Sequence, residues 1–127
     1  MSFDMPTYGR AIGPFVDAEL REAWRAMRSS EPTVGFLHLE RAHVMGQAST
    51  YQHVRVHLHM LAWGLRTRDV RETAGQLLRI VGAATKTPFG LVPTGNTGGA
   101  DISPVKPLPI PGDLAKVIED AKRAAKS

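Results

Sequence analysis

Residues 35–63, GFLHLERAHVMGQASTYQHVRVHLHMLAW, decide how this chain folds, because they hold two helix patterns on either side of a short turn signal. Gly46 interrupts the first pattern, and Ser49 followed by Gln52 has the form of a capping box, which begins a helix. Helices joined by so short a turn lie antiparallel. All the histidines of the 127-residue chain fall in this stretch: His38, His43, His53, His57 and His59. The sequence predicts a helical hairpin whose facing sides carry ionisable groups.

Four of these side chains have the spacing of metal ligands. His53 and His57, at i and i+4, project from one side of a helix, as do Glu40 and His43, at i and i+3. With the turn centred near residue 48, His43 comes level with His53, and Glu40 with His57. Two or three histidines and a carboxylate suit one Zn²⁺, Fe²⁺, Mn²⁺ or Cu²⁺ ion, with positions left for water or substrate. The chain has no cysteine, so nitrogen and oxygen must supply every ligand.

Other interpretations of the histidines stay open. Each can instead be a helix-interface residue that is hydrogen-bonded to polar neighbours. Without a metal, a histidine beside Glu40 can act as a general base, although no nucleophile signature accompanies it. Glu-x-x-His occurs once in the stretch, at residues 40–43, so a dinuclear site of the ferritin-like type would need two chains. Whether the protein is an enzyme is therefore left open.

The rest of the chain reads as all-α. Helices are predicted at about residues 17–28, 32–46, 50–66, 70–82 and 113–125. A loose repeat relates residues 24–39 to residues 63–78, which favours helical hairpins in a small four-helix bundle or a tetratricopeptide-like stack. The expected core stripe of the third helix is Val54, Leu58, Leu61 and Leu65. The expected apolar face of the fourth is Val70, Ala74, Leu77, Leu78 and Val81.

The two ends of the domain are marked by glycine and proline. Residues 1–15 are predicted to form an extended N-terminal arm, which lies over the core or reaches a second subunit, so a homodimer is among the expectations. Residues 16–127 form a single helical domain, in which residues 86–111 make an ordered Gly/Pro-rich wrap before the C-terminal helix. In this wrap Lys86, Asn96 and Thr97 are candidates for a lid over the histidines or for an anion contact.

Composition limits the function classes. No apolar run is long enough for a membrane span, and the N-terminus has no pattern of a secretion signal, so a cytoplasmic protein is expected. The chain carries 16 Lys+Arg against 12 Asp+Glu, which raises the prospect of nucleic-acid binding. Its arginines are spread over four predicted helices without a dense run, which favours a solvated basic surface instead.

Four motifs resemble a family of small bacterial proteins known only as a domain of unknown function. They are GFLHLERAH at residues 35–43, HVRVH at 53–57, GAATKTPFG at 82–90 and TGNTGGA at 94–100. The resemblance covers about residues 17–120 and implies that His38, Glu40, His43, His53 and His57 belong to the family motif, whereas His59 departs from it. It also implies a gene neighbourhood of heavy-metal efflux or resistance, and it implies no activity.

The sequence thus favours a protein that binds one transition-metal ion through Glu40, His43, His53 and His57, in metal homeostasis or as a small mononuclear metalloenzyme. The alternative is a tetratricopeptide-like adaptor that binds a protein partner without metal.

Overall fold

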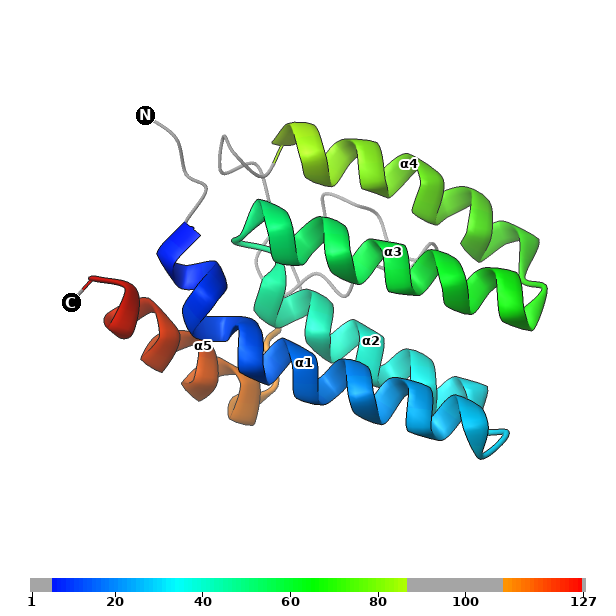
Figure 1. Ribbon diagram of the computed structural model, residues 1–127, viewed down its shortest axis with the longest axis horizontal. Helices are drawn as coiled ribbons and strands as arrows, with labels where there is room; N and C mark the ends of the chain where they lie inside the picture. Colours follow the sequence, from blue (N-terminus) through cyan, green and yellow to red (C-terminus); the bar gives the residue numbers. More distant parts are fainter. Residues whose placement is uncertain (1–5, 87–108, 127) are drawn as a thin grey trace.

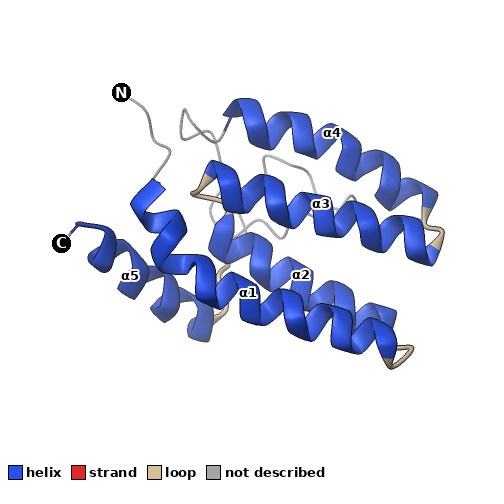
Figure 2. Cartoon of the chain, in the orientation of Figure 1, coloured by secondary structure: helices blue, strands red, loops and turns tan. Residues whose placement is uncertain are grey.

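The computed structural model describes residues 6–86 and 109–126, and all regular structure within these ranges is helical. The helices are α1 (Pro6–Arg28), α2 (Pro32–Gly46), α3 (Thr50–Thr67), α4 (Val70–Lys86) and α5 (Gly112–Lys126), as Figure 1 shows. Short turns join α1 to α2, α2 to α3 and α3 to α4 (Figure 2). The predicted all-α class is confirmed. Most of the predicted wrap lies outside the described residues.

The helices pack in chain order as antiparallel neighbours. α1 pairs with α2, α2 with α3 and α3 with α4, while α5 lies against α1 (Figure 1). α3 also touches α1, but α4 packs on α3 alone among the described helices. As a result α3 is the central element, and its face toward α2 and α4 is covered from two sides. A four-helix bundle or a tetratricopeptide-like stack, as finer descriptions of this arrangement, stay predictions.

The first helix begins far earlier than expected. It starts at Pro6, and residues 6–15 are helical, so an extended arm over residues 1–15 is wrong for the part that the structure describes. A Cβ on Gly9 would lie 2.5 Å from the Ser49 hydroxyl oxygen, so this glycine serves a close helix–helix approach and is no helix breaker. The inner side of α1 carries a buried stripe at a spacing of four: Tyr8, Ile12, Val16 and Leu20.

The helix caps predicted around α3 and α4 are present. The Gln52 backbone N–H donates to the Ser49 hydroxyl at 3.3 Å, and the Glu72 backbone N–H donates to the Asp69 carboxylate at 2.9 Å. The Gln52 side chain does not complete a capping box, because its amide donates to the carbonyl of Gly9 at 3.1 Å. The cap of α3 is thereby tied to α1.

α3 buries a different face from the predicted apolar stripe. Leu58 and Leu65 of that stripe are 50% and 61% exposed. The buried residues are instead Gln52, His53, Val56, His57, Met60 and Gly64. The prediction was wrong because counting apolar positions could not show that α3 is covered by helices on its histidine side.

α4 shows the same reversal. Its predicted core face is exposed throughout: Val70, Ala74, Leu77, Leu78 and Val81. Glu72, Gln76 and Ala83 are the buried positions, so α4 turns its polar side toward α3. None of the helices in residues 6–86 and 109–126 combines the length and hydropathy of a membrane span.

Candidate metal centre

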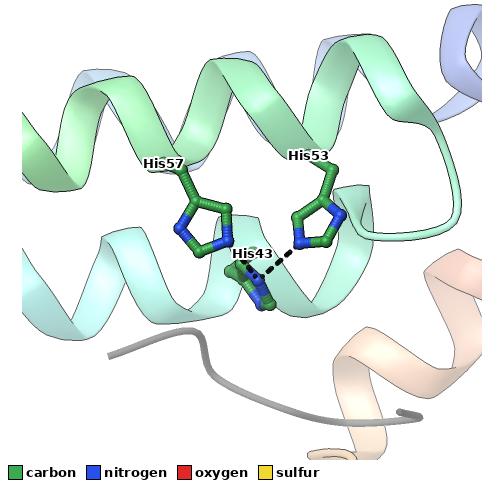
Figure 3. A group of neighbouring side chains, drawn as sticks. All are labelled: His43, His53 and His57. Atoms are coloured by element: carbon green, nitrogen blue, oxygen red, sulfur yellow. Dashed lines mark hydrogen bonds between the residues drawn. The ribbon is translucent and has the colours of Figure 1, made fainter. Parts of the chain in front are cut away.

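Three imidazoles meet between α2 and α3. His53 and His57 project from α3 toward His43 on α2, as Figure 3 shows. The Nε2 atom of His43 lies 3.0 Å from Nε2 of His53 and 3.1 Å from Nε2 of His57. A ligand atom from each ring lies within 4.8 Å of those of the other two. We call this group the histidine cluster. It is sealed from solvent, with relative exposures of 2%, 7% and 2% for residues 43, 53 and 57.

The local fold explains the convergence. His53 and His57 are one turn apart on α3, so their rings leave the helix on the same side. The Ser49 cap starts α3 only three residues after α2 ends, which forces the two helices to lie antiparallel and side by side. His43, one turn before the end of α2, therefore points between the two rings of α3.

A chain of hydrogen bonds identifies the tautomer of His57. Its Nδ1 atom lies 2.5 Å from Oε1 of Gln76, and Nε2 of Gln76 faces the carboxylate of Glu72. An ionised carboxylate only accepts hydrogen bonds, so the NH₂ end of the Gln76 amide must point to it. The amide oxygen then faces His57, whose Nδ1 must carry the proton. Consequently Nε2 of His57 directs a lone pair into the cluster.

That lone pair restricts the hydrogen bonds that the three rings can make to one another. If Nε2 of His43 is protonated, one N–H must serve both close contacts. If it is not, two lone pairs face each other across the 3.1 Å contact with His57. In either tautomer of His43 one contact lacks a proton of its own. A cation at the centre would accept all three lone pairs at once.

The spacing is close to that of a bound ion. Two imidazole nitrogens that each lie 2.0–2.1 Å from a tetrahedral Zn²⁺ are about 3.3–3.4 Å apart. The contacts of 3.0 and 3.1 Å need to open by only a few tenths of an ångström to reach this value, which small ring rotations supply. Both contacts of His43 are thus near the spacing that a metal needs, and the ligand atoms of all three rings lie within 4.8 Å of one another.

Burial also keeps the rings in the state that binds metals. It lowers the pKa of His53 to about 3, with a smaller contribution from His57. It lowers the pKa of His57 to about 4, although the hydrogen bond to Gln76 acts in the opposite direction. Both imidazoles are therefore neutral at physiological pH, with a lone pair on one nitrogen.

Glu40, the fourth predicted ligand, lies outside the histidine cluster. It is partly buried on α2 and lines a hollow of about 500 Å³, whose other walls include Phe36, Trp63 and Glu72. Among the described side chains, the group with metal-ligand spacing contains the three histidines and no carboxylate.

The remaining histidines have other partners. Nδ1 of His38 lies 2.7 Å from a carboxylate oxygen of Glu19. Nδ1 of His59 accepts a hydrogen bond of 2.9 Å from the indole N–H of Trp24. Both are outside the cluster, which makes them useful controls.

The candidate lid residues add little to this picture. Lys86 is the last residue of α4, and Asn96 and Thr97 lie outside the described residues. Gln76 and Glu72 were not predicted as part of the site, because their only signal in the sequence is a pair of polar residues at i and i+4 on the helix that follows the histidines.

Comparison with known proteins gives a family and no activity. A family model described as "Protein of unknown function (DUF3703)" matches residues 10–118. Neither the search of curated proteins nor the search of solved structures finds a match.

Proposed function

We propose that this chain, which belongs to the DUF3703 family of proteins of unknown function, binds one transition-metal ion through Nε2 of His43, His53 and His57. The observation that carries the proposal is the convergence of three buried imidazole nitrogens from two helices, with contacts of 3.0 and 3.1 Å. Three buried imidazoles whose ligand atoms lie this close together supply nitrogen donors of the kind that transition metals prefer.

The donor set narrows the metal. Imidazole ligands suit Zn²⁺, copper, iron and Ni²⁺, whereas Mn²⁺ prefers carboxylates, so Mn²⁺ becomes the weakest of the four metals expected from the sequence. Three neutral ligands leave the charge of the ion uncompensated. The carboxylate of Glu72 offsets part of it through Gln76 and His57, as carboxylate–histidine pairs do in many metal sites. We favour Zn²⁺ or copper, with the fourth position taken by water or a small ligand.

In this proposal Glu40 is not a metal ligand, although the sequence predicted it as one. Glu40 is on the same helix as His43, three residues away, and lines the same hollow as Glu72. We assign it to the outer surroundings of the ion and expect Glu40→Gln to weaken binding less than replacement of any cluster histidine. Metal homeostasis and a small mononuclear metalloenzyme both remain compatible with such a site.

Metal analysis of protein purified without an affinity tag tests the proposal. We expect close to one ion per chain, and loss of that ion in His43→Ala and in His57→Ala. His38→Ala and His59→Ala are matched controls, because they remove the same side chain from the same two helices outside the cluster. Substitution with Co²⁺ should give the visible absorption of a nitrogen-coordinated tetrahedral ion, since the absorption of Co²⁺ depends on its coordination geometry.

Two outcomes would overturn the proposal. One is a metal content that stays the same in the His43→Ala variant. The other is equal loss in the His38→Ala or His59→Ala control, which would place the ion elsewhere. Circular dichroism of each variant separates loss of metal from loss of fold.

A protein-interaction module is the second candidate. It is favoured by the exposed apolar side of α4, where Leu77 and Leu78 are 55% and 77% exposed and Val70 and Val81 lie on the same helix. Within this reading the homodimer expected from the sequence is the simplest partner. Light scattering of the wild type and of Leu77→Glu/Leu78→Glu tests it, and metal-free wild-type protein that dimerises through this face would favour the module over the metal site.

A further inference from the structure

The fold aligns arginines that are dispersed in the sequence. α1 and α3 run side by side in the same direction, because Gly9 meets Ser49 at their N-terminal ends and Trp24 meets His59 farther along (Figure 1). On α1 one side carries Arg10, Asp17, Arg21, Arg25 and Arg28. On α3 the side facing it carries Tyr51, Arg55, His59 and Arg66.

Two hollows join along this line. One, of about 440 Å³, lies at the N-terminal ends of the helices, and the other, of about 630 Å³, lies farther along. Asp17 and Arg55 line both, so the two hollows adjoin on either side of the Asp17–Arg55 ion pair, and we call them together the α1–α3 groove. From Arg10 to Arg28 it extends about 27 Å, at the 1.5 Å rise per residue of a helix. This is long enough for an extended ligand.

The α1–α3 groove is strongly basic. Its carboxylates are already committed: Glu22 binds Arg25 at 3.0 Å, and Asp17 binds Arg55 at 2.6 Å. Four further arginines form no ion pair with any described carboxylate: Arg10, Arg21, Arg28 and Arg66. Six arginines against two carboxylates leave the groove with a net charge of +4, which equals the formal net charge of the whole chain.

Aromatic rings accompany the charge. Tyr51 is 70% exposed at one end of the groove. At the other end the guanidinium of Arg66 lies 5.6 Å from the centre of the Trp24 ring, whose indole N–H is held by His59. Arginines that track a backbone, with flat side chains for bases, are the elements of a single-strand binding surface.

We propose that the α1–α3 groove binds single-stranded nucleic acid. The four arginines without carboxylate partners would contact phosphates, Tyr51 would stack on a base, and the Trp24–Arg66 pair would offer a second stacking surface. About 27 Å spans about eight nucleotides at 3.4 Å per phosphate, and fewer in an extended strand. Neighbouring helix axes lie only about 8–10 Å apart, so the floor of the groove admits one strand and no duplex.

Fluorescence anisotropy with a labelled 12-nucleotide oligo-dT, and separately oligo-rU, tests this on the intact protein. Four phosphate contacts predict a slope of log K against log[salt] of about −3, from −0.7 per contact on a single strand. Arg21→Glu/Arg28→Glu should at least halve the slope and weaken binding more than tenfold. Tyr51→Ala should weaken binding about tenfold at unchanged slope, because it removes stacking and no charge.

A charge-matched control distinguishes binding in the groove from attraction by the net charge of the protein. Arg71→Glu/Lys126→Glu makes the same change in charge at exposed positions outside the groove, and it should keep wild-type binding. Equal loss in this control would overturn the proposal, as would tighter binding of duplex or equal binding of a polyglutamate of the same charge. His43→Ala leaves the groove untouched and should bind the oligonucleotide like the wild type, so failure of the metal site does not affect this test.

Discussion

Metal-free protein should become much less stable between about pH 7 and pH 5, because two buried imidazoles resist protonation. The pKa of His53 is lowered to about 3 and that of His57 to about 4, against about 6.5 for both in the unfolded chain. Well above pH 6.5 both rings are neutral in either state. Below it the unfolded chain gains protons that the folded protein does not, so stability falls with falling pH until the folded values are reached.

The size of the effect follows from these values. At pH 5 each ring is about 1.5 units below its unfolded pKa, and at 1.36 kcal/mol per unit this costs about 2 kcal/mol. His53 and His57 together cost about 4 kcal/mol relative to pH 8, a large part of the 5–15 kcal/mol typical of a folded domain. Saturating metal at 100 times its Kd would add about 2.7 kcal/mol at neutral pH, and acid would remove it as the ligands protonate.

Urea unfolding followed by circular dichroism in the presence of a chelator, at several values from pH 8 to pH 5, measures this loss. His53→Gln/His57→Gln should be less dependent on pH over the same range, because it removes both rings. An unfolding midpoint that is the same at pH 8 and pH 5 for the wild type, with an unchanged urea dependence, would refute the reasoning. It would mean that the two rings are charged or hydrated in the folded protein.

Three further predictions concern single substitutions. Gln76→Leu should weaken metal binding about 10–100-fold, because His57 loses the acceptor that orients it, while one ion per chain still binds at saturation. Competition with a chromophoric chelator measures the affinity. An affinity equal to that of the wild type would contradict this prediction. Gly9→Ala should destabilise the fold by about 1–3 kcal/mol, since the new Cβ would meet the Ser49 hydroxyl at 2.5 Å, and a thermal midpoint equal to that of the wild type would contradict the close approach. Gly82→Ala should instead stabilise α4 by about 0.5–1 kcal/mol, because its Cβ would have no neighbour within 4 Å; a lower thermal midpoint would show a contact there.

In the middle of the chain, local sequence signals were sufficient to predict where the helices begin. Pro32 at the start of α2, the Ser49 cap of α3 and the Asp69 cap of α4 act within one helical turn, so the sequence places these boundaries almost where the structure has them. The spacing of His53 and His57 is likewise a property of one helix. For these features the physics is local, and the predictions agree with the structure.

Which face of each helix is buried could not be predicted from the sequence. The apolar stripes of α3 and α4 point outward, and polar residues such as His57 and Gln76 are inside, because the neighbours of a helix decide which face is covered. The start of α1 was missed for a related reason. Gly9 looks like a breaker until the hydroxyl of Ser49, forty residues away in the chain, is seen against it.

The sequence by itself determined an all-helical chain with a turn that brings one histidine helix back upon another. Only the tertiary structure decided that His43 meets both His53 and His57 and that Gln76 links His57 to Glu72. It also decided that arginines far apart in the sequence line one groove. The physical reason is the range of the forces. Helix periodicity and capping act over three or four residues, whereas a metal site and a charged surface depend on which helices come to lie side by side.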